Sequence, residues 1–170
     1  MIIENLEEIK DNLYPVIIIG SGPASISLAL KLEEEKISCL IIEAGNEKYD
    51  HDSQDFYEGI VVGDNISNLR HSRLRQLGGT SGHWGGWCKP MDKYNIESWG
   101  LNFNELSKYS EETCNILGLK NNFNKVELNN YFNQIQFQYS TVRFAKKFKN
   151  IIQKTKYINL IIRAHATHFI

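Results

Sequence analysis

The residues best suited to chemistry near the start of the chain form a glycine turn. Gly20 and Gly22 hold the first two positions of a Gly-x-Gly-x-x-Gly pattern, and Ser25 stands at the third. The first glycine permits a tight turn, and the second lets the backbone approach a pyrophosphate, which binds the free N–H groups at the start of the next helix. Pro23 and Ala24 begin that helix. Because serine is small, we expect slightly looser packing at Ser25 and an intact phosphate site.

An acidic residue follows at the end of the next apolar run. Glu43 precedes Ala44, and its distance from the glycines is that at which a carboxylate accepts hydrogen bonds from the ribose of a dinucleotide. Its negative charge disfavours a 2′-phosphate, so NADP would bind poorly. The alternative is a tight turn that binds no ligand, but a strand, a helix and an acid in this order favour the dinucleotide site.

The elements that must position these residues form a strand–helix–strand unit. Pro15–Ile19 is a β-branched run typical of a strand buried on both faces, Ala24–Lys36 has apolar residues at helical spacing, and Ser38–Glu43 is a second strand-like run. This succession predicts two parallel strands joined by a helix. The predicted fold class is therefore α/β, a Rossmann-like FAD/NAD(P)-binding domain with a parallel sheet.

The rest of the chain supplies further elements. Helical spacing predicts helices over Asn104–Leu117, which Gly118 would end, and over Val142–Lys156. Ile158–Arg163 is predicted as a third strand of the sheet, and Glu4–Leu13 as a short amphipathic helix. We therefore expect an amino-terminal extension over residues 1–14 and a binding domain over residues 15–170, incomplete at its carboxyl end.

A second glycine-rich segment lies in the middle of the chain, where residues 78–86 hold five of the twelve glycines. Such a run presents several N–H groups to an anion or a ring edge, and Trp84 and Trp87 add flat apolar surface of the kind a flavin ring needs. The alternative is a glycine-rich surface loop with two buried tryptophans. The candidate binding residues of this segment are Gly78, Gly79, Ser81, His83, Trp84, Gly85 and Gly86.

These motifs resemble those of the glucose–methanol–choline oxidoreductases, and the resemblance covers nearly the whole chain. Residues 73–87 (RLRQLGGTSGHWGGW) carry most of it, and their GGxSxH part is similar to pyranose and choline oxidases. The weaker matches are the glycine turn at Gly20–Ala24, the Glu43–Gly45 strand end, Trp99 with Glu105 and Leu106, and Leu117–Leu119.

The resemblance implies an FAD cofactor and hydride transfer to the flavin from the CH–OH group of an alcohol or sugar. It places the adenine against the backbone near Ala166, in the turn that follows the third strand, and it places His83 against the flavin. Pyranose and choline oxidases carry, at the position that His83 matches, a histidine bonded to the flavin 8α-methyl group. Covalent attachment of FAD through His83 is therefore a further hypothesis.

The same resemblance implies that part of the enzyme is missing. In the family the catalytic base lies near the carboxyl end and a separate substrate domain shapes the pocket, and neither is found in this sequence. We therefore assign no catalytic residue, and we expect a truncated chain that is inactive without a carboxyl-terminal half. Two alternatives stay open: a non-catalytic flavin-binding or interaction module, and an NAD-dependent Rossmann enzyme.

The composition of the chain indicates which kinds of partner and which cell compartment to expect. A net charge of −1 gives no reason to expect nucleic acid as a partner. No apolar run approaches the ~20 residues of a membrane span, and Met1–Lys10 lacks the apolar core of a secretory signal. Three widely spaced cysteines fit a reducing compartment, so we expect a cytoplasmic protein. No His or Cys spacing predicts a metal site.

Overall fold

The computed structural model describes residues 2–3, 5, 7, 9, 14–64 and 67–168. The chain forms two compact units. The first comprises Met1–Trp84 and Arg143–Ile170, and the second is the intervening segment Gly85–Val142. The range 15–170, which the sequence predicts as one binding domain, is thus shared between two units.

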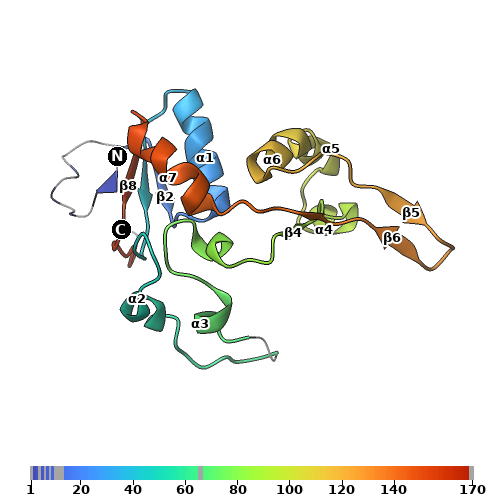
Figure 1. Cartoon of the computed structure of the whole chain (residues 1–170), viewed down its shortest axis with the longest axis horizontal. Helices are drawn as coiled ribbons and strands as arrows, with labels where there is room; N and C mark the ends of the chain where they lie inside the picture. Colours follow the sequence, from blue (N-terminus) through green and yellow to red (C-terminus); the bar gives the residue numbers. More distant parts are fainter. Residues whose placement is uncertain are drawn as a thin grey trace. The chain divides into compact units, whose positions relative to one another are not determined.

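A four-stranded, all-parallel sheet is the centre of the first unit (Figure 1). Its strands are β1 (Ile2–Ile3), β2 (Val16–Ile19), β3 (Cys39–Ile42) and β8 (Ile158–Ile161), in the spatial order β1-β8-β3-β2. Parallel pairing joins β2 to β3 and β3 to β8 along their whole lengths. The predicted parallel arrangement of the three apolar runs is therefore confirmed, and the fold class is mixed α/β.

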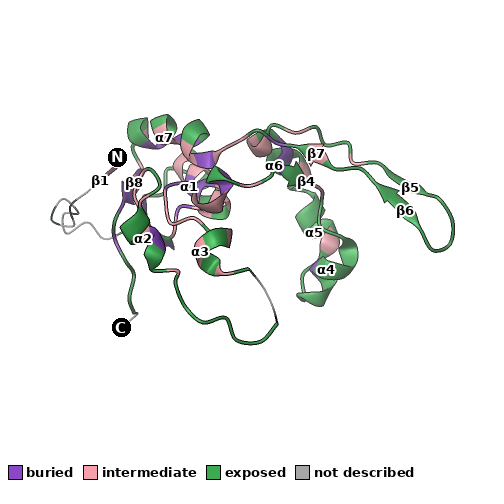
Figure 2. Cartoon of the chain, turned by 60° about the horizontal axis from the view of Figure 1, so that its bottom comes forward, coloured by how far each residue is buried: buried purple, intermediate pink, exposed green. Residues whose placement is uncertain are grey.

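Two helices cover one face of this sheet. The helices α1 (Pro23–Glu34) and α7 (Phe144–Lys154) both pack against β8 and also against each other. Both begin and end close to the predicted ranges, and Pro23 stands in the first turn of α1, where its missing N–H costs no hydrogen bond. The buried residues of the two helices are Ile26, Ala29, Phe144, Phe148 and Ile152. Figure 2 shows the ribbon coloured by burial, with α1 and α7 labelled.

The opposite face of the sheet is covered only in part. Ile3, Leu40 and Ile161 form a buried cluster there, against which Ile9 and Tyr14 pack. Farther along the same face, at the edge strand β2, the side chains of Ile17 and Ile19 are 58% and 50% exposed. The apolar surface of the sheet therefore continues beyond the part that the described residues cover.

The amino-terminal extension contributes a strand. Ile2–Ile3 pairs in parallel with Leu160–Ile161 of β8, and two residues are too few to give a recognisable strand pattern in the sequence. The helix predicted over Glu4–Leu13 falls largely outside the described residues.

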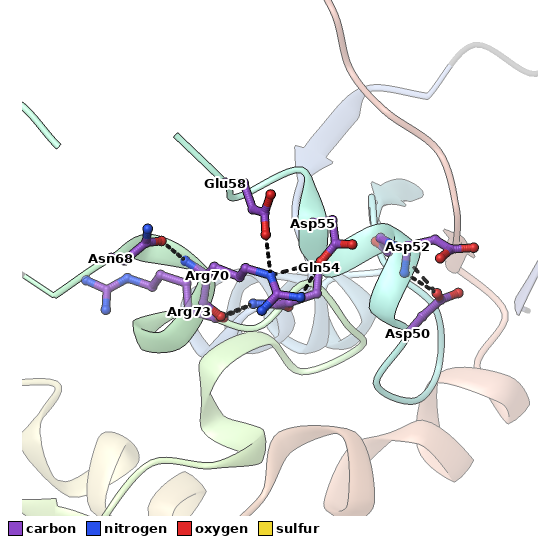
Figure 3. Close-up of polar contacts among 9 residues, drawn as sticks. Asp50, Asp52, Gln54, Asp55, Glu58, Asn68, Arg70 and Arg73 are labelled. Atoms are coloured by element: carbon purple, nitrogen blue, oxygen red, sulfur yellow. Dashed lines mark hydrogen bonds and ion pairs between the residues drawn. The ribbon is translucent and has the colours of Figure 1, made fainter. Parts of the chain in front are cut away.

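A polar network holds the loop between β3 and the second glycine segment (Figure 3). This loop contains the short helices α2 (His51–Asp55) and α3 (Leu69–Ser72), each capped by a side chain at its start. The fully buried Gln54 of α2 donates from Nε2 to the carbonyl oxygens of Arg70, at 2.7 Å, and Arg73, at 2.6 Å. Arg70 also forms an ion pair with Asp55. These contacts fix the path of the chain as it approaches Gly78.

The second unit consists of short elements. The strands β4 (Trp87–Cys88) and β7 (Gln138–Tyr139) form one antiparallel pair, and β5 (Lys125–Glu127) and β6 (Asn133–Ile135) form a hairpin. Three helices precede the hairpin: α4 (Lys93–Ser98), α5 (Phe103–Ser107) and α6 (Ser110–Leu117).

The helix predicted over Asn104–Leu117 is broken in two. The first piece, α5, is capped by the side chain of Asn102, and the backbone turns at Lys108–Tyr109 before α6 begins. Ser107 donates its hydroxyl to the carbonyl of Asn104, a local bond of the kind that competes with a continuous helix. The predicted end is confirmed, because Gly118 closes α6 with φ +67°.

The cysteines of the folded chain should differ in reactivity. Burial raises the pKa of Cys39, Cys88 and Cys114, so the fraction of reactive thiolate at neutral pH falls below that of a free thiol. Cys39 is fully buried and Cys114 nearly so, whereas Cys88 is partly exposed. We expect iodoacetamide to label Cys88 first and Cys39 last, with a Cys88 rate that rises as pH approaches its raised pKa. Timed alkylation with peptide mass spectrometry measures the order, and equal rates in the native and denatured chain would contradict it.

Candidate functional site

The glycine turn joins β2 to α1. Gly20 adopts φ +86°, a conformation that favours glycine, and its N–H donates to the carbonyl of Ile42 on the neighbouring strand at 2.8 Å. Gly22 is the N-cap of α1, and no side chain caps this helix. A methyl group placed on Gly22 would meet no heavy atom within 4 Å. The first turn of α1 therefore offers backbone N–H groups beside open space.

A pocket of about 480 Å³ opens at this point. It lies where β2, β3 and β8 end, between the residues that follow each strand. In open parallel sheets, ligands bind outside the carboxyl ends of the strands. The predicted site residues that line it are Gly20, Gly22, Pro23, Glu43, Ala44, Gly79 and Ala166. The structure thus brings together residues from both glycine segments and from all three strand ends.

The carboxylate of Glu43 is held mainly by the protein. Its Oε2 accepts from the N–H of Ser21 at 2.8 Å and from the Ser21 hydroxyl at 2.6 Å, and its Oε1 accepts from the N–H of Gly45 at 2.7 Å. Glu43 is only 6% exposed, yet it lines the pocket. A carboxylate oxygen can accept two hydrogen bonds, so one acceptor position remains on Oε1 for a ligand hydroxyl.

Ser21 was not identified from the sequence. It is fully buried, and its hydroxyl donates to Glu43 and accepts from the N–H of Gly78 at 3.2 Å. Next to this bond, a methyl group on Gly79 would lie 3.3 Å from the Cα of Gly22, so the backbones of the two glycine segments are in contact. The glycine turn and the second glycine segment, which are far apart in the sequence, are therefore packed against each other.

Gly78 and Ser81 have structural roles beside the pocket. Gly78 adopts φ +80°, and a methyl group there would lie 2.5 Å from the backbone nitrogen of Ala145 in α7. The Ser81 hydroxyl donates to the carbonyl of Gly78 at 2.6 Å and accepts from the N–H of Phe144 at 3.1 Å. This part of the segment therefore fixes the start of α7, and neither residue lines the pocket.

The remaining residues of the second motif are not at the pocket. His83 is exposed, and Trp84, whose carbonyl accepts from Arg143, does not line the pocket either. Gly85 and Gly86 belong to the second unit, where Gly86 accepts from the N–H of Ser140 at 2.7 Å. Ala24 lies in α1 outside the pocket lining. Contact of His83 or Trp84 with a flavin, and a covalent bond at His83, remain predictions.

The pocket lining also includes three residues that were not predicted as site residues: Tyr57, Arg75 and His165. They come from three distant segments, namely the end of α2, the stretch before the second glycine motif and the turn after β8. Only folding brings them together. With Glu43 they give the pocket its charged and aromatic groups.

The chain matches no model of a known protein family and no curated protein. Among the described residues, no His, Cys, Asp and Glu side chains gather in threes or more as a metal site requires. The helices of the described segments are all too short or too polar to cross a membrane.

Proposed function

We propose that the pocket binds the ADP part of a dinucleotide and that the chain is the Rossmann-like, FAD-binding portion of a flavin-dependent oxidoreductase. One observation carries the proposal. Gly22 leaves open the space beside the uncapped start of α1, and Glu43, with one acceptor position left, lines the same pocket. Anions bind at such helix starts because free N–H groups and the helix dipole favour negative charge.

The residues present fit an ADP group. The backbone around Gly22 and the first turn of α1 would hold the pyrophosphate, because a side chain at residue 22 would occupy the space that a phosphate needs. Glu43 would accept a ribose hydroxyl with its remaining acceptor position. The backbone of Ala164–Ala166, which lines the pocket after β8, would face the base.

The choice of FAD over NAD comes from the second glycine segment and its resemblance to the glucose–methanol–choline oxidoreductases. A bound flavin would supply the hydride acceptor for oxidation of an alcohol or sugar. The resemblance also implies a base from a carboxyl-terminal half, so we expect no alcohol oxidation by this chain alone. The packing of this segment against the glycine turn supports the proposal, because it makes both motifs part of one pocket wall.

Substitution of Gly22 by alanine tests the proposal. We expect the affinity for ADP and for FAD to fall at least about tenfold, or 1.4 kcal/mol, because the methyl group would stand where the phosphates approach. The free energy of unfolding should change by less than about 1 kcal/mol, because φ −67° suits alanine and the methyl group meets no atom. Isothermal titration calorimetry and thermal unfolding measure the two effects.

Gly59→Ala is a matched control, because a methyl group there is also free of contacts and Gly59 is not part of the pocket lining. It should leave both affinity and stability unchanged. Failure of the unmodified chain to bind ADP or FAD would refute the proposed function. Preference for NAD over FAD in the same titration would favour the NAD-dependent alternative.

A further inference from the structure

Arg75 occupies an unusual position on the wall of the pocket. Its Cζ lies 5.1 Å from the ring centroid of Phe56 and 5.4 Å from that of Tyr57. Its Nη2 donates to Nε2 of His165 at 3.1 Å. Arg75, Tyr57 and His165 all line the pocket. The guanidinium thus lies among three rings, where an arginine can stack on flat surfaces.

The backbone of Arg75 is fixed, so the side chain begins from a defined place. Its N–H donates to Oε1 of the buried Gln54 at 3.0 Å. Its carbonyl packs directly against Gly45, where a methyl group would overlap it. The next residues continue this contact, because the N–H of Leu77 donates to the carbonyl of Asn46 at 2.9 Å.

These contacts place Arg75 at the ribose end of the pocket. Gly45 follows Glu43 by two residues, and the N–H of Ala164, just before His165, donates to the Glu43 carbonyl at 3.0 Å. Gly22 and Gly79, whose backbones are in contact, line the same pocket. A nucleotide whose phosphates lie at Gly22 and whose ribose meets Glu43 would place its base next to Arg75.

The charge of Arg75 is not neutralised by an acid. Its polar side-chain partners within the described residues are the Ser53 hydroxyl, at 3.4 Å, and His165, and no ion pair includes it. A guanidinium in this setting can stack on a flat heterocycle and donate to its ring nitrogens without displacing an anionic partner. The neighbouring ring of Tyr57 adds a second flat surface.

We propose that Arg75, together with Tyr57, forms the wall that recognises the purine base of the bound nucleotide. This inference rests on the proposed function, because it assumes that the phosphates lie at Gly22. It gives a specificity-determining role to Arg75, which lies three residues before Gly78 in the second motif and was not predicted as a site residue. Recognition is by the flat face and the ring nitrogens of the base, and not by a phosphate.

The test compares ligands with and without the base. The affinities of ADP, ribose 5-diphosphate and adenosine 2′,5′-diphosphate are measured by calorimetry for the unmodified chain, Arg75→Met and Arg75→Lys. We expect Arg75→Met to lower the affinity for ADP about fivefold or more, which is the scale of one lost stacking contact. Ribose 5-diphosphate should bind the unmodified chain and Arg75→Met with equal affinity. Arg75→Lys should behave like Arg75→Met, because an ammonium group has no flat face.

Arg73→Met is the matched control. The Arg73 side chain is exposed, lies outside the pocket lining and donates to the adjacent Ser72 carbonyl, so its removal should leave all three affinities unchanged. Thermal unfolding confirms that each variant is folded. A second pair of variants changes Tyr57 and leaves Arg75 in place. Tyr57→Phe should keep the affinity for ADP, whereas Tyr57→Ala should lower the affinity for ADP and leave the affinity for ribose 5-diphosphate unchanged.

The outcomes separate this inference from the proposed function. If the unmodified chain binds neither ADP nor ribose 5-diphosphate, the proposed function fails. If it binds both and Arg75→Met weakens them equally, the function stands and the base-recognition role is wrong. Two other results would show that Arg75 binds a phosphate charge and would also overturn the inference. One is an Arg75→Lys variant with the full affinity for ADP. The other is an Arg75→Met variant that loses more affinity for adenosine 2′,5′-diphosphate than for ADP.

Discussion

Substitution of Gly45 by alanine should destabilise the first unit by about 3 kcal/mol or more, the upper range for overpacking a closed site. The methyl group would overlap the carbonyl carbon and oxygen of Arg75 and lie 2.5 Å from the backbone nitrogen of Gln76. All three atoms belong to the backbone, so no side-chain rotation can relieve the overlap.

The surrounding hydrogen bonds prevent Gly45 from moving aside. Its own carbonyl accepts from the N–H of Arg163 at 2.9 Å, and its N–H donates to Glu43 at 2.7 Å. On the other side, Asn46 and Gln76 form a β-bridge. Three segments of the chain therefore meet at Gly45, and separating them breaks several contacts at once.

Urea unfolding of the Gly45→Ala and Gly22→Ala variants measures the effect. The two substitutions add the same methyl group, but only the first meets the backbone. We expect a clear loss of unfolding free energy in Gly45→Ala and little change in Gly22→Ala. A Gly45→Ala chain as stable as the unmodified chain would mean that the loop before Gly78 does not pack against the end of β3.

Removal of the Glu43 carboxylate should affect both stability and binding. In Glu43→Ala the N–H groups of Ser21 and Gly45 lose their buried acceptor, and each unsatisfied donor costs about 1–3 kcal/mol. We therefore expect the free energy of unfolding to fall by about 3 kcal/mol. Binding of ADP to the fraction that remains folded should weaken by about 1–3 kcal/mol, the scale of a charge-assisted hydrogen bond.

Glu43→Gln separates the two effects. The amide oxygen can still accept one N–H, but the amide nitrogen faces a donor, so we expect an intermediate loss of stability. Glu47→Ala is the control at the same strand end: Glu47 pairs with Lys149 near the surface, and such pairs contribute about 0–1 kcal/mol. Calorimetry on folded protein and urea unfolding measure the two quantities. Unchanged ADP affinity in Glu43→Gln would show that the carboxylate only holds the glycine turn.

The sheet and its helices could be predicted because their signals are local. The β-branched run before Gly20, the apolar spacing of α1 and α7 and the run over β8 each specify one element, and a parallel sheet follows from their order. The strand at Ile2–Ile3 was missed because two residues are too few to show the alternation of apolar and polar side chains that identifies a strand. The break between α5 and α6 was missed because hydroxyl bonding of Ser107 to the backbone leaves the apolar spacing intact.

The site could be predicted only at its motif positions. The spacing of Gly20, Gly22 and Glu43 places them at the pocket, but it does not show that most of the Glu43 carboxylate is held by Ser21 and Gly45. Arg75 and His165 are ninety residues apart in the chain and meet through tertiary contacts. Such long-range pairs leave no periodic pattern in the sequence, which explains why the aromatic and basic wall of the pocket was missed.

The parallel pairing of β1 with β8 has a consequence for the order of assembly. Ile2–Ile3 is synthesised well before its partner strand, Ile158–Ile161, because the other described strands and helices all lie between them in the chain. β8 also stands between β1 and β3 in the sheet, and its turn closes the pocket. During translation β2, α1 and β3 can associate before β8 is synthesised, whereas β1 can pair only after β8 is present. Completion of the four-stranded sheet is therefore a long-range step, of the kind that slows folding and prolongs exposure of apolar edges.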